Sequence, residues 1–223
     1  MLMAMRIAWH RRNALIILSL EGIMKQTSIK GPGVIILLLL IGISTRFLFL
    51  GETQSFLPNF TAVGAVALFG SNYLHGKTKY ILPLFIMWVS DLFLNNIFYA
   101  SYFESFQFFG DIWVYAGFLL VVLIGHFIMR KPSWLTLMGA GIGGGIIFYL
   151  ITNFGVWIHP ASGYPKDIGG LVLSYVNGIP FLRNTILGNL VYGITLFGMY
   201  EFLASKYHSL RTERCLVSRL SSM

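Results

Sequence analysis

Charged residues are scarce in this sequence. Of its 223 residues only 11% are Asp, Glu, Lys or Arg, whereas 56% are hydrophobic and the mean hydropathy is +0.73. An ordinary soluble domain carries about 25% charged residues. The scarcity of charge therefore excludes a typical soluble fold and predicts an all-α, polytopic membrane protein.

Cysteine is almost absent as well. The single Cys215 excludes an internal disulfide framework and a cysteine-based metal site. The five histidines show no clustered spacing, so we expect no metal. The G-x-S-x-G element of serine hydrolases is missing, and only one aspartate lies within an apolar segment, where an aspartyl protease needs two. We therefore expect no enzyme activity and no cofactor.

Long apolar runs dominate the chain instead. Six segments approach the roughly 20 residues that a transmembrane helix needs. They cover residues 33–50, 60–74, 81–98, 112–129, 135–157 and 179–203. The sequence therefore predicts a bundle of six transmembrane helices, in which the short second segment is the weakest member. The connection before the sixth segment continues into "LVLSYVNGIPF", for which we expect a short helix that lies at the interface or dips back.

The basic residues indicate the topology. Thirteen of the sixteen Lys and Arg residues fall before the first segment, in the second and fourth connections, or after the sixth segment. Because basic residues gather on the cytoplasmic side, both termini are predicted in the cytoplasm, with the chain multi-pass in a bacterial inner membrane. The net charge of +8 then points to a lipid bilayer as partner and not to nucleic acid.

This topology divides the chain into three parts. Residues 1–30 form a cytoplasmic extension, which is either an amphipathic helix or a stretch upstream of a true start at Met24. Residues 31–204 form the transmembrane domain, and residues 205–223 form a basic cytoplasmic tail.

Polar side chains within the apolar segments fall at similar depths, given a rise of about 1.5 Å per residue. Asp91 lies in the third segment with Asn95 one turn further out, and Arg46 lies near the outer end of the first. Polar positions from five segments are predicted to converge on the outer half of the membrane. The candidate binding residues are Arg46, Asn59, Asp91, Asn95, Asn153, Trp157, Tyr164, Arg183 and Asn184.

Three interpretations of this cluster remain open. An ionisable residue in a span usually faces the bundle interior with a partner, and Arg46 or Arg183 suits Asp91. The cluster is then either a structural ion pair or a pocket for a small solute, in which the amides supply hydrogen bonds and Trp157 and Tyr164 stack. A charge-balanced pocket suits a neutral or zwitterionic heterocycle. The third interpretation is a lipid head-group enzyme that uses Asp91 with His159.

Glycines form a second pattern, in the fifth segment. "GAGIGGG" lacks the preceding strand and the following acidic residue of a dinucleotide fingerprint. In an apolar helix its members make small-xxx-small pairs that permit close helix approach. The pairs are Gly139 with Gly143 and Gly141 with Gly145. They predict packing within the bundle or docking of a membrane partner.

Five motifs together resemble a known family. They are "LPNFTAVGAVALFG", "LPLFIMWVSDLFLNN", "WVYAGF", "TNFGVW" and "GIPFLRNTILGNLVYG". Over about residues 33–200 they are similar to a family of uncharacterised six-helix bacterial membrane proteins described as transport proteins. That family is distantly similar, at the level of the fold, to the substrate-binding S components of energy-coupling factor (ECF) transporters.

The resemblance implies capture of a small solute from outside, together with a membrane coupling subunit and its ATPases. The positions that match its motifs are Asn59, Phe60, Asp91, Asn95, Asn153, Trp157, Pro180, Phe181 and Asn184. One departure concerns the coupling subunit. The A-x-x-x-A pair that S components often use to dock it is missing from the first apolar segment.

Overall fold

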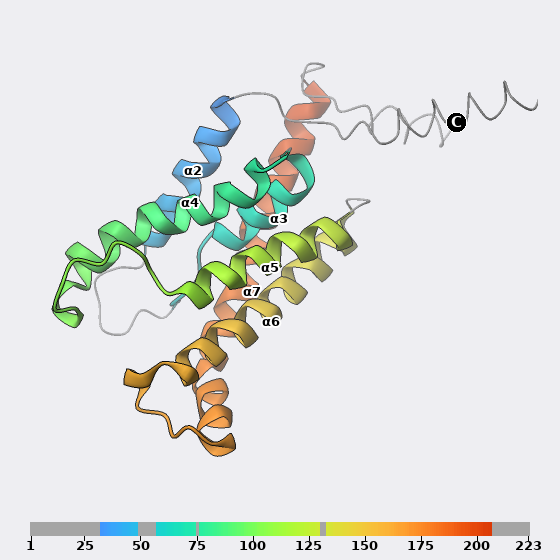
Figure 1. Cartoon of the computed structure of the whole chain (residues 1–223). Coiled ribbons are helices and arrows are strands. Elements are labelled where there is room, and N and C mark those ends of the chain that lie inside the picture. Colours follow the sequence, from blue (N-terminus) through green and yellow to red (C-terminus); the bar gives the residue numbers. More distant parts are fainter. Residues whose placement is uncertain (1–31, 49–56, 75, 130–132, 207–223) are drawn as a thin grey trace, which may run out of the picture. The chain divides into compact units, whose positions relative to one another are not determined.

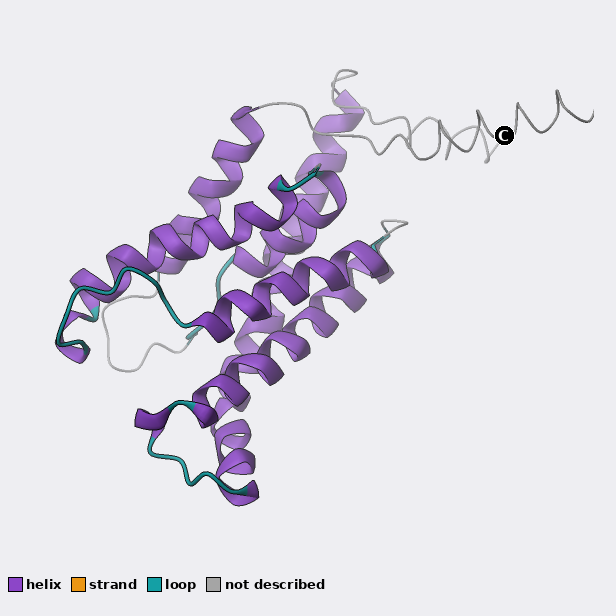
Figure 2. Cartoon of the chain, in the orientation of Figure 1, coloured by secondary structure: helices purple, strands orange, loops and turns teal. Residues whose placement is uncertain are grey.

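The computed structural model describes residues 32–48, 57–74, 76–129 and 133–206, which belong to one compact unit spanning Ile29–Leu210. Within these residues every regular element is a helix (Figure 2). The all-α expectation is therefore confirmed. The expected N-terminal extension, the tail beyond Lys206 and Cys215 lie outside the described residues.

Six α-helices are described, one for each predicted apolar segment (Figure 1). They are α2 (Pro32–Phe47), α3 (Val63–Tyr73), α4 (Thr78–Phe93), α5 (Ile112–Ile128), α6 (Trp134–Ile158) and α7 (Ile168–Lys206). Three short elements join them: the π-helix η1 (Leu94–Phe98) and the 3-10 helices η2 (Ala100–Tyr102) and η3 (Pro160–Ser162).

Three helical stretches are long and apolar enough to cross a membrane: Thr78–Phe98, Trp134–Ile158 and Ile168–Leu203. Two apolar helices are shorter, Gly33–Phe47 and Ile112–Ile128. These lengths indicate a membrane protein. The number of six spans, the inner membrane and the cytoplasmic termini stay predictions.

The core forms around α3. All of its residues from Val63 to Tyr73 are buried, and it contacts each of the other five described α-helices. Small side chains in "VGAVALFGS" permit this close approach. At roughly 1.5 Å per residue the helix is only about 16 Å long, about half the hydrocarbon thickness. The apolar sequence of α3 is explained by its burial among the other five described α-helices.

The last helix differs from the prediction. A span over 179–203 was expected, preceded by a short helix at the interface or one dipping back. Instead α7 runs continuously from Ile168 through Pro180 to Lys206. The Asp167 carboxylate accepts a hydrogen bond from the Gly170 N–H at 2.8 Å, as a helix N-cap does. Its 39 residues correspond to roughly 58 Å, which exceeds the hydrocarbon core of about 30 Å.

The glycines of α6 separate into two pairs. A Cβ atom on Gly141 would lie 3.0 Å from Leu190, and one on Gly145 would lie 2.7 Å from Ile186, so this pair packs against α7. At Gly139 and Gly143 no described atom lies within 4 Å of such a Cβ. Docking of a partner at this second pair stays a prediction.

Candidate functional site

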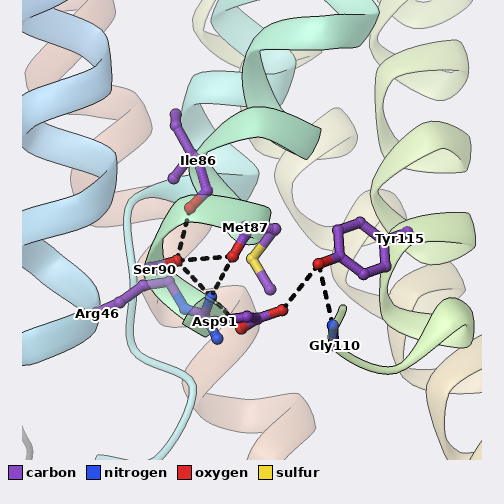
Figure 3. A network of polar contacts seen from close by, with 7 residues as sticks. All are labelled: Arg46, Ile86, Met87, Ser90, Asp91, Gly110 and Tyr115. Carbon is purple, nitrogen blue, oxygen red and sulfur yellow. Dashed lines mark hydrogen bonds and ion pairs between the residues drawn. The ribbon is translucent and has the colours of Figure 1, made fainter. Parts of the chain in front are cut away.

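An ion pair joins α2 to α4 (Figure 3). Arg46 in the last turn of α2 places Nη1 2.6 Å from Asp91 Oδ1, and the two side chains are 17% and 9% exposed. The same nitrogen donates to Ser90 Oγ at 2.5 Å and to the Met87 carbonyl at 3.2 Å. Three acceptors on one face of α4 therefore fix the position of the guanidinium group.

The second carboxylate oxygen of Asp91 also has a protein partner. Tyr115 on α5 donates its hydroxyl proton to Asp91 Oδ2 at 3.1 Å and accepts from the Gly110 N–H at 3.3 Å (Figure 3). A Cβ on Gly110 would lie 2.1 Å from Asp91 Oδ2, so a side chain there would displace the carboxylate. Asp91 thus connects Arg46 to α5 and is held by the protein on both oxygens.

The helix changes form directly after Asp91. The π-helix at Leu94–Phe98 contains Asn95, which lies one turn beyond Asp91 and is half-buried. Asn96 has a structural role, since its amide bonds the Leu92 carbonyl and both backbone groups of Gln107 at 2.7–2.9 Å. It ties the end of α4 to the α4–α5 connection.

A cavity of about 440 Å³ adjoins the ion pair, and Arg46 and Met87 lie in its wall. Ligand pockets typically measure about 300–1,000 Å³. All six described α-helices contribute to the lining. The apolar part of the wall includes Met87, Val114, Phe118, Val121, Phe148 and Val156.

One face of α7 forms the longest side of the cavity. Its lining residues recur at the three- or four-residue spacing of a single helix face. They are Ser174, Asn177, Gly178, Phe181, Thr185 and Asn189. From first to last they extend along roughly 22 Å of helix at 1.5 Å per residue. The sequence prediction missed half of this face because it began the helix at residue 179.

The predicted site residues divide into two groups. The cavity is lined by four of them: Arg46, Asn59, Asn153 and Tyr164. Asp91 is not part of the lining but forms an ion pair with Arg46, which is. Asn59 is exposed and has a positive φ of 64°, a conformation that asparagine tolerates better than most residues.

The other predicted residues do not line the cavity. Trp157 donates its indole N–H to the Pro165 carbonyl at 2.9 Å and thereby closes the α6–α7 connection. Asn184 is buried at 5% exposure, outside the lining, and Asn95 is half-buried in the π-helix. Arg183 is exposed, and the described residues offer it no ion pair. Of the two arginines considered for Asp91, the structure therefore selects Arg46.

The histidine proposed for head-group chemistry lies elsewhere. His159 Nδ1 accepts from the Ala161 N–H at 3.3 Å. Among the described residues no hydrogen bond or ion pair joins His159 to Asp91. Within the same part of the chain, no three His, Cys, Asp or Glu residues gather where they could hold a metal ion.

Comparison with known proteins gives one match. A protein-family model described as "Family of unknown function (DUF6580)" matches residues 27–211 of the chain. Neither the curated proteins nor the solved structures give a match to the chain. The expected membership of an uncharacterised family is confirmed, whereas the similarity to transport proteins and S components stays a prediction.

Proposed function

The chain belongs to this family of unknown function, and we propose that it captures a small solute at the outer face of the bacterial inner membrane. It acts as a transporter or as the substrate-binding subunit of one. The observation that carries the proposal is the cavity of about 440 Å³ beside the Arg46–Asp91 pair. A convergent set of polar groups in a mostly apolar cavity is typical of small-molecule sites.

The position of the cavity along the helices supports an outward-facing site. Its lining comes from the last turn of α2, from the first turn of α3 and from the C-terminal half of α6, and it includes Val114 and Phe118 in the first half of α5. The distribution of basic residues predicts that these ends face outward. A solute would then enter without crossing the aromatic cluster at the other end of α3, where Phe69 and Tyr73 pack against Phe197.

The charges of the site favour a neutral or zwitterionic solute. Arg46 is neutralised by Asp91 at 2.6 Å, so an anion would add an uncompensated negative charge in a place of low dielectric constant. Phe118, Phe148 and Phe181 offer flat apolar surfaces to a ring system. These features fit a heterocycle better than a strongly charged ion.

A membrane coupling subunit with ATPases is part of the proposal. The glycine pair Gly139 and Gly143 offers a surface on α6 for a second helix, because no described atom lies within 4 Å of a Cβ added at either position. Solute binding does not depend on this surface, so the two parts of the proposal are tested separately.

Solute capture is tested by mass spectrometry of what remains bound to protein purified from its native membrane. Asn153→Leu alters the cavity wall, and Thr195→Val is the control, because Thr195 is exposed on α7 and its hydroxyl bonds the Val191 carbonyl of its own helix. We expect the wild type and the control to retain one small molecule and Asn153→Leu to lose it. A wild type that retains no solute, and whose overproduction changes no uptake, would rule out the proposed function.

The second candidate is a membrane scaffold for envelope machinery, in which the polar cluster serves as structural ion pairs. One observation favours it: both oxygens of Asp91 and one nitrogen of Arg46 already have protein partners. A scaffold predicts that variants of the pair impair folding or assembly and that no solute is retained.

A further inference from the structure

Two of the four asparagines that line the cavity, Asn153 and Asn189, are oriented alike. Asn153 Nδ2 donates to the Tyr149 carbonyl at 2.9 Å, and Asn189 Nδ2 donates to the Gly141 carbonyl at 3.0 Å. Turning either amide over would set its oxygen against a carbonyl oxygen, so these bonds fix the orientation of each amide. Each bond uses one of the two Nδ2 protons, so Oδ1 and the second N–H of each amide remain available.

Each of these oxygens lies against a glycine of another helix. A Cβ on Gly178 would lie 2.2 Å from Asn153 Oδ1, and one on Gly64 would lie 2.0 Å from Asn189 Oδ1. Asn189 is only 2% exposed yet lines the cavity, and its Oδ1 has no hydrogen-bond partner in the part of the chain that the structure describes. A buried acceptor normally has a donor, so an occupant of the cavity can donate to this oxygen.

Two hydroxyl groups of the same wall add further acceptors. Thr152 donates to the Phe148 carbonyl at 2.9 Å, and Ser174 donates to the Leu171 carbonyl at 2.9 Å. A hydroxyl has one proton and two lone pairs, so both oxygens can still accept. The wall formed by α6 and α7 therefore offers four acceptor oxygens, beside the second N–H of each of the two amides.

We infer that the solute is a hydrogen-bond donor: a non-anionic compound with N–H or O–H groups that face Asn153 and Asn189. The inference rests on the proposed function and narrows it to amines, amides, N–H heterocycles and hydroxylated compounds. Arg46 alone would suggest an anion, but its charge is balanced by Asp91. A carboxylate or phosphate set against the amide oxygens would be repelled by them and would find the charge of Arg46 already balanced.

The inference is tested on the small molecule released from the purified full chain. Its net charge and its number of exchangeable hydrogens are measured by mass spectrometry in H2O and in D2O. Two variants remove acceptors: Asn189→Leu, and the milder Thr152→Val, which keeps the side-chain shape and breaks no bond between helices. Thr195→Val is again the control.

We expect a non-anionic molecule with more than one exchangeable hydrogen. Loss of one well-aligned bond should weaken retention about tenfold in Asn189→Leu and several-fold in Thr152→Val. An anion, a lipid or a molecule without exchangeable hydrogens overturns the inference. The inference is also overturned if Thr152→Val and folded Asn189→Leu both retain the small molecule at the wild-type level. In that case the proposed function still stands. A wild type that retains nothing overturns both.

Discussion

Removing the carboxylate of Asp91 should destabilise the bundle by an amount that the structure lets us estimate. In Asp91→Leu the guanidinium of Arg46 keeps only Ser90 Oγ and the Met87 carbonyl as partners, and the Tyr115 hydroxyl loses its acceptor. Breaking one partner of a buried pair typically costs about 3–5 kcal/mol. Because the Arg46 side chain is 17% exposed, we expect the lower end, about 3 kcal/mol of unfolding free energy.

Two related variants separate charge from shape. Asp91→Asn keeps an acceptor for Arg46 and loses the ionic part, which makes up about half of a charge-assisted bond, so we expect a cost of about 1–2 kcal/mol. The double variant Arg46→Met with Asp91→Leu removes both charges and should recover most of the loss, to within about 1 kcal/mol of the wild type.

Unfolding in detergent micelles, followed by far-UV circular dichroism, measures the wild type, these three variants and the single variant Arg46→Met. The reasoning fails if Asp91→Leu costs less than about 1 kcal/mol, or if the double variant is as unstable as the sum of the single ones. Asp91→Asn also separates the two proposed functions. A receptor stays folded and loses solute as Arg46 becomes less firmly held, whereas a scaffold loses assembly.

Two further predictions concern the helix contacts. Gly145→Val should lower the unfolding free energy by about 1–3 kcal/mol, because its Cβ would lie 2.7 Å from Ile186, whereas Gly143→Val meets no described atom and should be neutral in the same assay. Asn96→Ala removes three hydrogen bonds to the Leu92 carbonyl and to Gln107, so amide exchange in residues 97–111 should rise at least about tenfold; unchanged protection would show that these bonds are not needed.

The positions of the helices followed from apolar run length, but the start of α7 did not. Residues 168–178 include Ser174, Asn177 and Gly178, which break the apolar pattern and suggested a separate element. In the structure these three residues lie on the face of α7 that lines the cavity. The polar residues that hid the start of α7 from the sequence prediction are therefore residues of the candidate site.

The partners within the site were only partly predictable. Depth along a helix follows from residue number, so Arg46 and Arg183 were both compatible with Asp91. The choice depends on how each helix is rotated about its axis, which tertiary packing determines. Tyr115 escaped prediction because an aromatic residue in an apolar run has no pattern of its own, and the π-helix that contains Asn95 has no signal in the sequence.

The central claim is that the cavity beside Arg46 holds a solute. An experimental structure of the protein purified from its native membrane, without added ligand, tests it most directly. We predict density for one compact molecule within contact of Arg46 and of the Asn189 amide oxygen. A cavity closed by its own side chains, or filled by a lipid acyl chain, would contradict the account.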